Sequence, residues 1–233
     1  MSEQELAGRM IRVRDEVAEA AEKCGRSASD VQVVAVSKLH PAADIRTVHE
    51  QAGQLDFGEN YVQEATAKQD ELSGLDLRWH FIGGLQSNKA KYVAGRFALV
   101  HSVDSAKLAA MLDKKARSLG VVQDILLQVN IAGEEQKSGV AEDGLNRLAD
   151  EVAAMDGLRM QGLMTMPPFF NDPERARPVF AELRRLRERL SARMGLGLPH
   201  LSMGMTGDFV PAVEEGATLV RIGTRIFGAR PQK

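Results

Sequence analysis

The sequence predicts an α/β protein built as a closed (β/α)8 barrel, and three observations lead there. Short apolar runs rich in β-branched residues alternate with longer amphipathic stretches along the 233 residues. About eight such strand-then-helix units follow one another at short spacing, which is typical of parallel βαβ units. The length lies at the short end of the usual range for this barrel. An open, doubly wound parallel sheet is the alternative.

The first strand and the helices on either side of it are predicted from residues 3–41. Residues 3–23 carry apolar side chains at near-helical spacing, and Cys24-Gly25 ends that stretch as glycine commonly ends a helix. Residues 31–36 read VQVVAV, a short apolar run that is typical of a buried strand. Pro41 then begins a helical stretch, because proline suits the first turn of a helix.

The remaining units repeat this order of strand and helix. Apolar runs predict strands at residues 55–57, 78–82, 97–101, 125–131, 158–164, 200–203 and 219–222. Amphipathic stretches after them predict helices at residues 61–72, 87–94, 105–119, 141–155, 174–194 and 208–215, and from 224 to the end. We therefore expect one domain spanning residues 1–233, a barrel preceded by an N-terminal helix.

Composition excludes several classes of protein. Thirty Lys and Arg against 32 Asp and Glu give a net charge of −2, and aromatic residues make up 5%, so we expect no nucleic-acid partner. The N-terminus is polar and no long apolar stretch lacks charge, so we expect neither a signal peptide nor a membrane span. The single Cys24 can form neither an intramolecular disulfide nor a zinc site, which favours a reducing compartment. We expect a cytoplasmic monomer without a metal.

Lys38 follows the first predicted strand, at the end of a barrel where active sites lie. Burial disfavours the charged form of an amine, and a neutral amine in a pocket forms Schiff bases with aldehydes. The alternative is that the Lys38 side chain simply extends to solvent.

The loops after the last two strands resemble phosphate-binding loops. Residues 202–208 and the Gly223-Thr224 pair supply hydroxyls and glycines directly before predicted helices. Ordinary turns and helix caps are the alternative, since serine and threonine serve both purposes.

Arg221 lies inside the eighth strand, and a buried arginine needs an acceptor. That acceptor is either a carboxylate across the barrel or the ring nitrogen of a pyridine cofactor. An amine for an aldehyde, a phosphate-binding loop and a partner for a ring nitrogen together match pyridoxal 5′-phosphate (PLP).

Several motifs strengthen this interpretation. Residues 34–38 read VAVSK, residues 57–64 read FGENYVQE, residues 79–89 read WHFIGGLQSNK and residues 221–228 read RIGTRIFG. With these motifs the chain resembles the YggS-like, or PROSC-type, pyridoxal phosphate homeostasis proteins along nearly its whole length. The segment at residues 79–89 is the most specific of them.

The resemblance implies the alanine racemase-like barrel of PLP fold type III, without the C-terminal β-domain of the racemases. It places the Schiff-base lysine at Lys38, the partner of the pyridine nitrogen at Arg221, and phosphate contacts at Ser202, Gly223 and Thr224. Residues that line the cofactor ring fall at Asn60, Met164 and Met203. Where the family reads Met-Ser in the seventh loop, this chain has Met205-Thr206, which keeps a hydroxyl.

The resemblance implies a function in PLP homeostasis, in which the protein holds PLP and supplies it to apo-enzymes. An arginine partner makes the ring a poorer electron sink, and a racemase needs a second base, so we expect binding rather than turnover. A PLP-dependent racemase is the alternative, with Tyr61, His80 and His101 as candidate second bases. A barrel enzyme acting on a phosphorylated metabolite without PLP is the third hypothesis.

Overall fold

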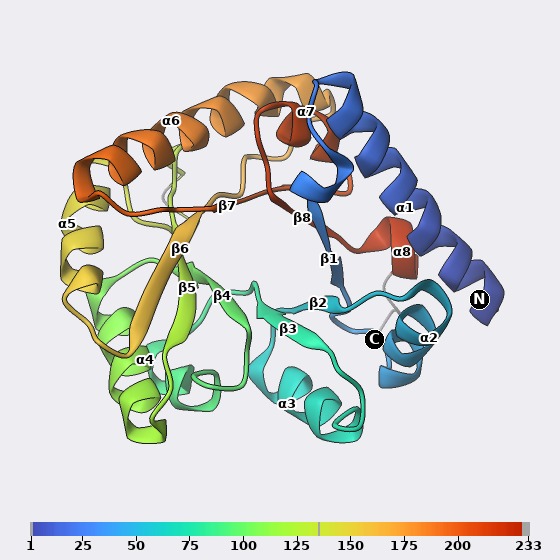
Figure 1. Ribbon diagram of the computed structural model, residues 1–233, viewed down its shortest axis with the longest axis horizontal. Helices are drawn as coiled ribbons and strands as arrows, with labels where there is room; N and C mark the ends of the chain where they lie inside the picture. Colours follow the sequence, from blue (N-terminus) through green and yellow to red (C-terminus); the bar gives the residue numbers. More distant parts are fainter. Residues whose placement is uncertain (1, 135, 230–233) are drawn as a thin grey trace.

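The computed structural model describes residues 2–134 and 136–229, in which the strands form one closed parallel barrel in sequence order (Figure 1). The strands are β1 (Gln32–Val36), β2 (Asp56–Glu59), β3 (Arg78–Phe81), β4 (Leu99–Val103), β5 (Gln123–Gln128), β6 (Leu158–Met164), β7 (His200–Met205) and β8 (Leu219–Ile222). Strand β8 pairs with β1, with Val34 opposite Arg221. This pairing confirms the predicted (β/α)8 barrel and rules out the open sheet.

Helices surround the barrel on its outer side (Figure 1). They are α1 (Glu3–Lys23), α2 (Ala42–Ala52), α3 (Val62–Glu71), α4 (Ala106–Leu119), α5 (Glu142–Ala153), α6 (Arg177–Met194), α7 (Phe209–Glu214) and α8 (Thr224–Phe227). Short 3-10 helices are η1 (Ala28–Asp30), η2 (Ser87–Tyr92) and η3 (Pro173–Ala176). Within residues 2–134 and 136–229, no helix has the length and apolar character that a membrane span requires.

Two predicted helices differ in the structure. The stretch at 87–94 is mainly the 3-10 helix η2, because its bonds run from Lys89 to Gln86 and from Val93 to Ala90, three residues apart. The helix predicted from 224 onward ends at Phe227, where Gly228 takes a φ of +85°. Residues 230–233 lie outside the described residues, as do residues 1 and 135 of the predicted domain.

Strand side chains alternate between two layers, as the pleat of a strand requires. Inward-facing residues of five strands form an apolar cluster inside the barrel, made of Val34, Leu99, Leu126, Met164 and Leu219. Their outward-facing neighbours, such as Val33 and Ala35, pack against the helices in the larger core. The barrel interior is therefore filled with side chains.

Helix α1 lies across one side of the barrel and packs against α2, α7 and α8 (Figure 1). Ser2 caps its N-terminus by accepting a hydrogen bond from the Glu5 N–H at 3.2 Å. Met10, Val13 and Val17 form part of its buried face. The N-terminal helix thus ties the first and last elements of the barrel together.

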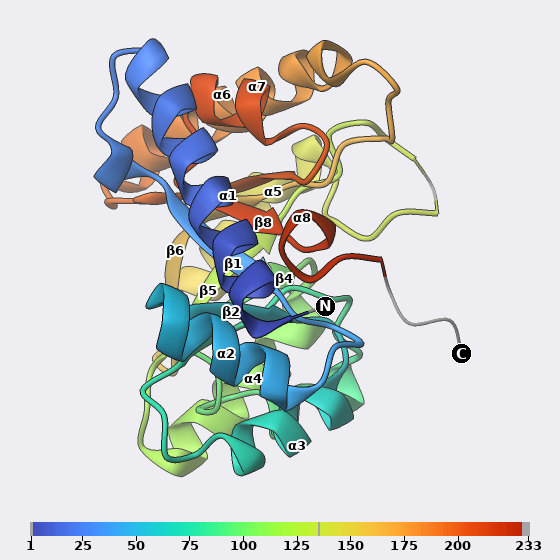
Figure 2. The same ribbon diagram turned by 90° about the vertical axis from the view of Figure 1, so that its right-hand side faces the viewer.

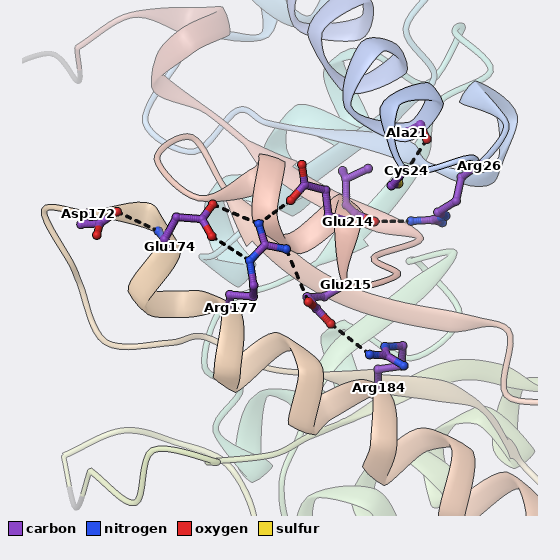
Figure 3. A network of polar contacts seen from close by, with 10 residues as sticks. Ala21, Cys24, Arg26, Asp172, Glu174, Arg177, Arg184, Glu214 and Glu215 are labelled. Atoms are coloured by element: carbon purple, nitrogen blue, oxygen red, sulfur yellow. Dashed lines mark hydrogen bonds and ion pairs between the residues drawn. The ribbon is translucent and has the colours of Figure 1, made fainter.

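A network of ion pairs holds α7 against α6 (Figure 3). Arg177 of α6 pairs with Glu174, with Glu214 and, at 3.4 Å, with Glu215. Arg184 donates to the other oxygen of Glu215 at 3.0 Å. A single surface ion pair contributes little to the stability of a protein, whereas several linked ion pairs fix the relative position of two helices more firmly. It holds in place the helix that follows the loop after β7.

Gly162 is required where β6 approaches β7. Its φ is +151°, and a Cβ added there would lie 1.9 Å from the carbonyl oxygen of His200. We expect Gly162→Ala to lower the free energy of unfolding by about 3 kcal/mol or more, because the two strands must separate locally. Urea unfolding measures this change. Gly74→Ala is the matched control, since that Cβ meets nothing within 4 Å; equal effects of the two substitutions would contradict the prediction.

Candidate functional site

A cavity of about 680 Å³ lies at the C-terminal ends of the strands. In Figure 2 the loops that follow β5 and β6 project to the same side as α8, and this is the cavity side of the barrel. Strand ends and the loops after them line the cavity, which is where barrel enzymes place their chemistry.

Five of the predicted site residues lie together in the wall of this cavity: Lys38, Asn60, Arg221, Gly223 and Thr224. The structure places the other three elsewhere. Met164 belongs to the apolar cluster inside the barrel, and Met203 to the core between strands and helices. Ser202 is fully buried and contacts Arg221 rather than the cavity.

Lys38 stands directly after β1, half-buried, with its side chain in the cavity wall. The Ser37 N–H donates to the Gly58 carbonyl at 3.1 Å, so β1 continues alongside β2 up to Lys38. The chain then turns, and the His40 N–H closes the turn onto the Ser37 carbonyl at 3.1 Å. Strand pairing and turn together bring Lys38 to the cavity.

Asn60 follows β2 and carries an unused acceptor. Its Oδ1 is buried and has no hydrogen-bond partner among the described residues. Gly83 allows this position, because a Cβ there would lie 2.3 Å from the Asn60 carbonyl oxygen. Buried polar atoms normally have partners, so an orphaned amide in a cavity wall fits a polar ligand.

Two hydroxyls from neighbouring loops meet at the cavity. The Thr224 hydroxyl donates to Thr206 Oγ1 at 3.3 Å, which joins the loop after β8 to the loop after β7. Asp208 closes the latter loop by accepting from the Met205 N–H at 2.6 Å, and burial raises the pKa of its carboxyl. Hydroxyls and glycine backbone at one place fit an anion such as phosphate.

Arg221 reaches the cavity from inside the barrel and is 3% exposed. Its guanidinium donates to Ser202 Oγ at 2.5 Å and to the Thr165 carbonyl at 3.0 Å. It makes no ion pair with any carboxylate in the described part of the chain, so the alternative of a salt bridge across the barrel does not hold. Burial lowers its pKa to about 10, which leaves it charged at neutral pH.

Behind Arg221, a chain of hydrogen bonds crosses the barrel interior. Ser202 Oγ lies 2.8 Å from His101 Nδ1, and His101 Nε2 lies 2.9 Å from His80 Nδ1. His80 Nε2 then lies 3.0 Å from a carboxylate oxygen of Asp56 at the start of β2. The chain therefore connects the cavity wall to the opposite end of the barrel.

A consistent set of proton positions can be written for this chain. Burial alone would raise the pKa of Asp56, but hydrogen bonds from His80 and Arg78 outweigh it and hold the pKa well below its usual range. Ionised Asp56 accepts from His80 Nε2. With His80 Nδ1 as the acceptor, His101 donates from Nε2 and accepts from the Ser202 hydroxyl at Nδ1. His101 is neutral in this arrangement, because burial lowers its pKa well below its usual value.

The three candidate second bases lie outside the cavity lining. His80 and His101 are buried in the hydrogen-bonded chain just described, and the Tyr61 side chain is half-exposed. None of the three belongs to the part of the described chain that lines the cavity.

One wall of the cavity was not predicted from the sequence. The apolar side of the cavity is formed by residues that follow β6, namely Met166, Pro167, Pro168, Phe169 and Phe170. The Phe169 side chain is 89% exposed. Lys137, from the loop after β5, donates to the Pro167 carbonyl at 2.9 Å and holds the two loops together. The run of two prolines and two phenylalanines after a strand was the available signal.

The neutral His101 predicts a pH dependence of stability. Burial, followed by the charges of His80 and Arg221, lowers the pKa of His101 well below its usual value. The unfolded chain binds a proton there below about pH 6.5, so this contribution is complete above that pH and is lost as the pH falls. We expect His101→Gln to reduce the slope of unfolding free energy against pH by up to about 1.4 kcal/mol per pH unit between about pH 6.5 and 5. Urea unfolding measures it, and identical slopes would contradict the assignment.

The comparisons with known proteins point to one family. The family model described as "Alanine racemase, N-terminal domain" matches residues 12–231. The pyridoxal phosphate homeostasis protein of Aquifex aeolicus is 44% identical over 222 residues, covering 95% of this chain and 97% of the relative. The protein of the same name from Pseudomonas aeruginosa is 45% identical over 225 residues, covering 97% and 96%.

Solved structures agree with these relatives. PipY of Synechococcus elongatus with PLP bound is 39% identical, with a TM-score of 0.85 over 96% of this chain and all of that chain. An alanine racemase from Clostridium difficile, at 14% identity and a TM-score of 0.68, shares the fold, and the match covers 53% of that longer chain. The chain therefore belongs to the alanine racemase N-terminal domain family and, within it, to the pyridoxal phosphate homeostasis proteins.

Proposed function

We propose that this protein binds PLP in the cavity, holds it through Lys38 and takes part in PLP homeostasis. The observation that carries the proposal is that Lys38, Arg221 and the Thr206–Thr224 pair line a single cavity. An amine, a fixed cation and two hydroxyls match the three functional ends of PLP, its aldehyde, ring nitrogen and phosphate. PLP, when bound, supplies an aldehyde that condenses reversibly with an amine.

Each residue contributes a separate property to the site. Lys38 provides the amine, and the Thr206 and Thr224 hydroxyls with Gly207 and Gly223 would hold the phosphate. Arg221 stays charged, so it would donate to the ring nitrogen and disfavour its protonation. Asn60 brings an unsatisfied amide oxygen to the same wall. These roles suit retention of PLP more than stabilisation of a carbanion.

Supply of PLP to apo-enzymes, a cytoplasmic location and a monomeric state are parts of the same proposal. The names of the relatives support the homeostasis role, and PipY, at 39% identity, has been solved with PLP bound. Cys24 is a free, exposed thiol, which suits a reducing compartment.

The first test concerns Lys38. Protein incubated with PLP should absorb in the near-visible range, and borohydride should fix one cofactor on Lys38, located by mass spectrometry of the digested protein. Lys38→Ala should abolish the reducible adduct and retain weak binding through the phosphate contacts. An adduct on Lys137, the other described lysine of the cavity wall, or on no lysine would contradict the proposal.

The racemase alternative is tested on the same protein. Incubation with L- or D-amino acids and chiral chromatography should show no rapid interconversion. Fast racemisation that disappears in Lys38→Ala would favour the enzyme over the homeostasis protein.

The second test concerns the phosphate contacts. We expect Thr224→Val to weaken PLP binding about tenfold or more, because a hydrogen bond to a charged group contributes about 1.5–3 kcal/mol. Binding of pyridoxal, which lacks the phosphate, should change less than about twofold. Spectroscopic titration with the two aldehydes measures both affinities, and an equal loss for both would contradict the assignment.

A further inference from the structure

A buried cluster of charges lies behind the Lys38 turn and is not part of the cavity wall. Lys68 of α3 lies 2.7 Å from Glu59 Oε1, 2.7 Å from Glu64 Oε1 and 2.8 Å from the Ser37 carbonyl. These three bonds use all three ammonium protons of Lys68. The Lys68 side chain is 8% exposed and that of Glu59 is fully buried. Lys68 and Glu64, both on α3, are thus held in one arrangement.

The cluster forms hydrogen bonds with the residues on both sides of Lys38. On the N-terminal side, Lys68 bonds the Ser37 carbonyl, and the Ser37 hydroxyl donates to Glu59 at 2.7 Å. On the C-terminal side, the Leu39 N–H donates to Glu64 Oε1 at 2.6 Å. Lys38 is the residue between these two anchor points.

The Leu39 backbone explains why such anchoring is needed. Leu39 has a φ of +65°, and no other non-glycine residue in the described parts of the chain has a positive φ. For an L-residue other than glycine this conformation is unfavourable, and it persists only where surrounding contacts enforce it. The short bond to Glu64 is the side-chain contact that holds the Leu39 N–H in this conformation.

We propose that Glu64, held by Lys68, is a positioning residue that keeps Leu39 in its left-handed conformation and thereby directs the Lys38 amine into the cavity. This inference rests on the proposed function, since it concerns how Lys38 meets an aldehyde. Glu64 acts through the main chain and does not itself line the cavity.

A purely structural role, in which the charges only fasten α3 to the barrel, leads to different expectations. Buried ion pairs are weak sources of stability compared with apolar packing, and Val62 and Ala65 already pack α3 into the core. If the charges only fastened α3, removing them would weaken the binding of every ligand of the cavity alike. A positioning role would affect only ligands that react with Lys38.

The experiment compares PLP with pyridoxine 5′-phosphate, which keeps the ring and phosphate but has no aldehyde. Stopped-flow absorbance gives the rate at which PLP becomes covalently bound, and competition gives the affinity for pyridoxine 5′-phosphate. We expect Glu64→Ala to slow covalent binding about tenfold or more, while the affinity for pyridoxine 5′-phosphate changes less than about twofold. Glu64→Gln should restore most of the rate, because an amide oxygen still accepts from the Leu39 N–H.

Two further variants complete the test. Leu39→Val leaves Glu64 intact but disfavours a positive φ, so it should slow covalent binding selectively in the same way, even if Glu64→Ala fails to fold. Glu151→Ala removes a matched i,i+4 ion pair, Arg147–Glu151, on helix α5 and should leave the rate unchanged.

Each outcome decides the question. Wild-type rates in both Glu64→Ala and Leu39→Val would overturn the positioning role, as would an equal loss of affinity for pyridoxine 5′-phosphate. If the wild-type protein forms no reducible adduct on Lys38, the proposed function itself fails, whatever the variants do.

Discussion

The Arg221 guanidinium in the barrel interior is the constraint around which the site is arranged. A buried cation is costly unless its protons are bonded, and here the acceptors are neutral, the Ser202 hydroxyl and the Thr165 carbonyl. Ser202 can accept from Arg221 because its own proton goes to His101, and the chain ends at ionised Asp56. Asp56 itself pairs with Arg78 at the other end of the barrel, and the carboxylate whose charge acts on Arg221 is Asp208 of the cavity wall.

A second buried network, around Lys68, also supports one residue of the cavity wall. The Lys68 ammonium group donates hydrogen bonds to Ser37, Glu59 and Glu64, and the resulting cluster fixes the turn that carries Lys38. In both places, buried polar groups outside the cavity lining hold one residue that lines the cavity. Buried hydrogen-bonded networks of this kind define a geometry more than they add stability.

Strand ends could be predicted from the sequence, whereas side-chain direction could not. Lys38, Arg221 and Thr224 were found because polar residues directly after apolar runs stand out, and because the motifs around them resemble a known family. Met164 and Met203 were expected at the cofactor ring, yet one fills the barrel interior and the other faces the helices. A shift of one residue along a strand reverses the face, so nearness in sequence does not show which side chains reach the cavity.

The amino-acid sequence by itself determined the alternation of strands and helices, the closed barrel that this alternation predicts, and the residues that chemistry would require at the strand ends. Only the tertiary structure decided which of those residues meet. His101 contacts Ser202 across 101 positions, and Leu39 contacts Glu64 across 25, because strand pairing and helix packing bring distant segments together. Local pattern specifies local conformation, whereas a hydrogen-bonded network depends on distances that only the closed barrel sets.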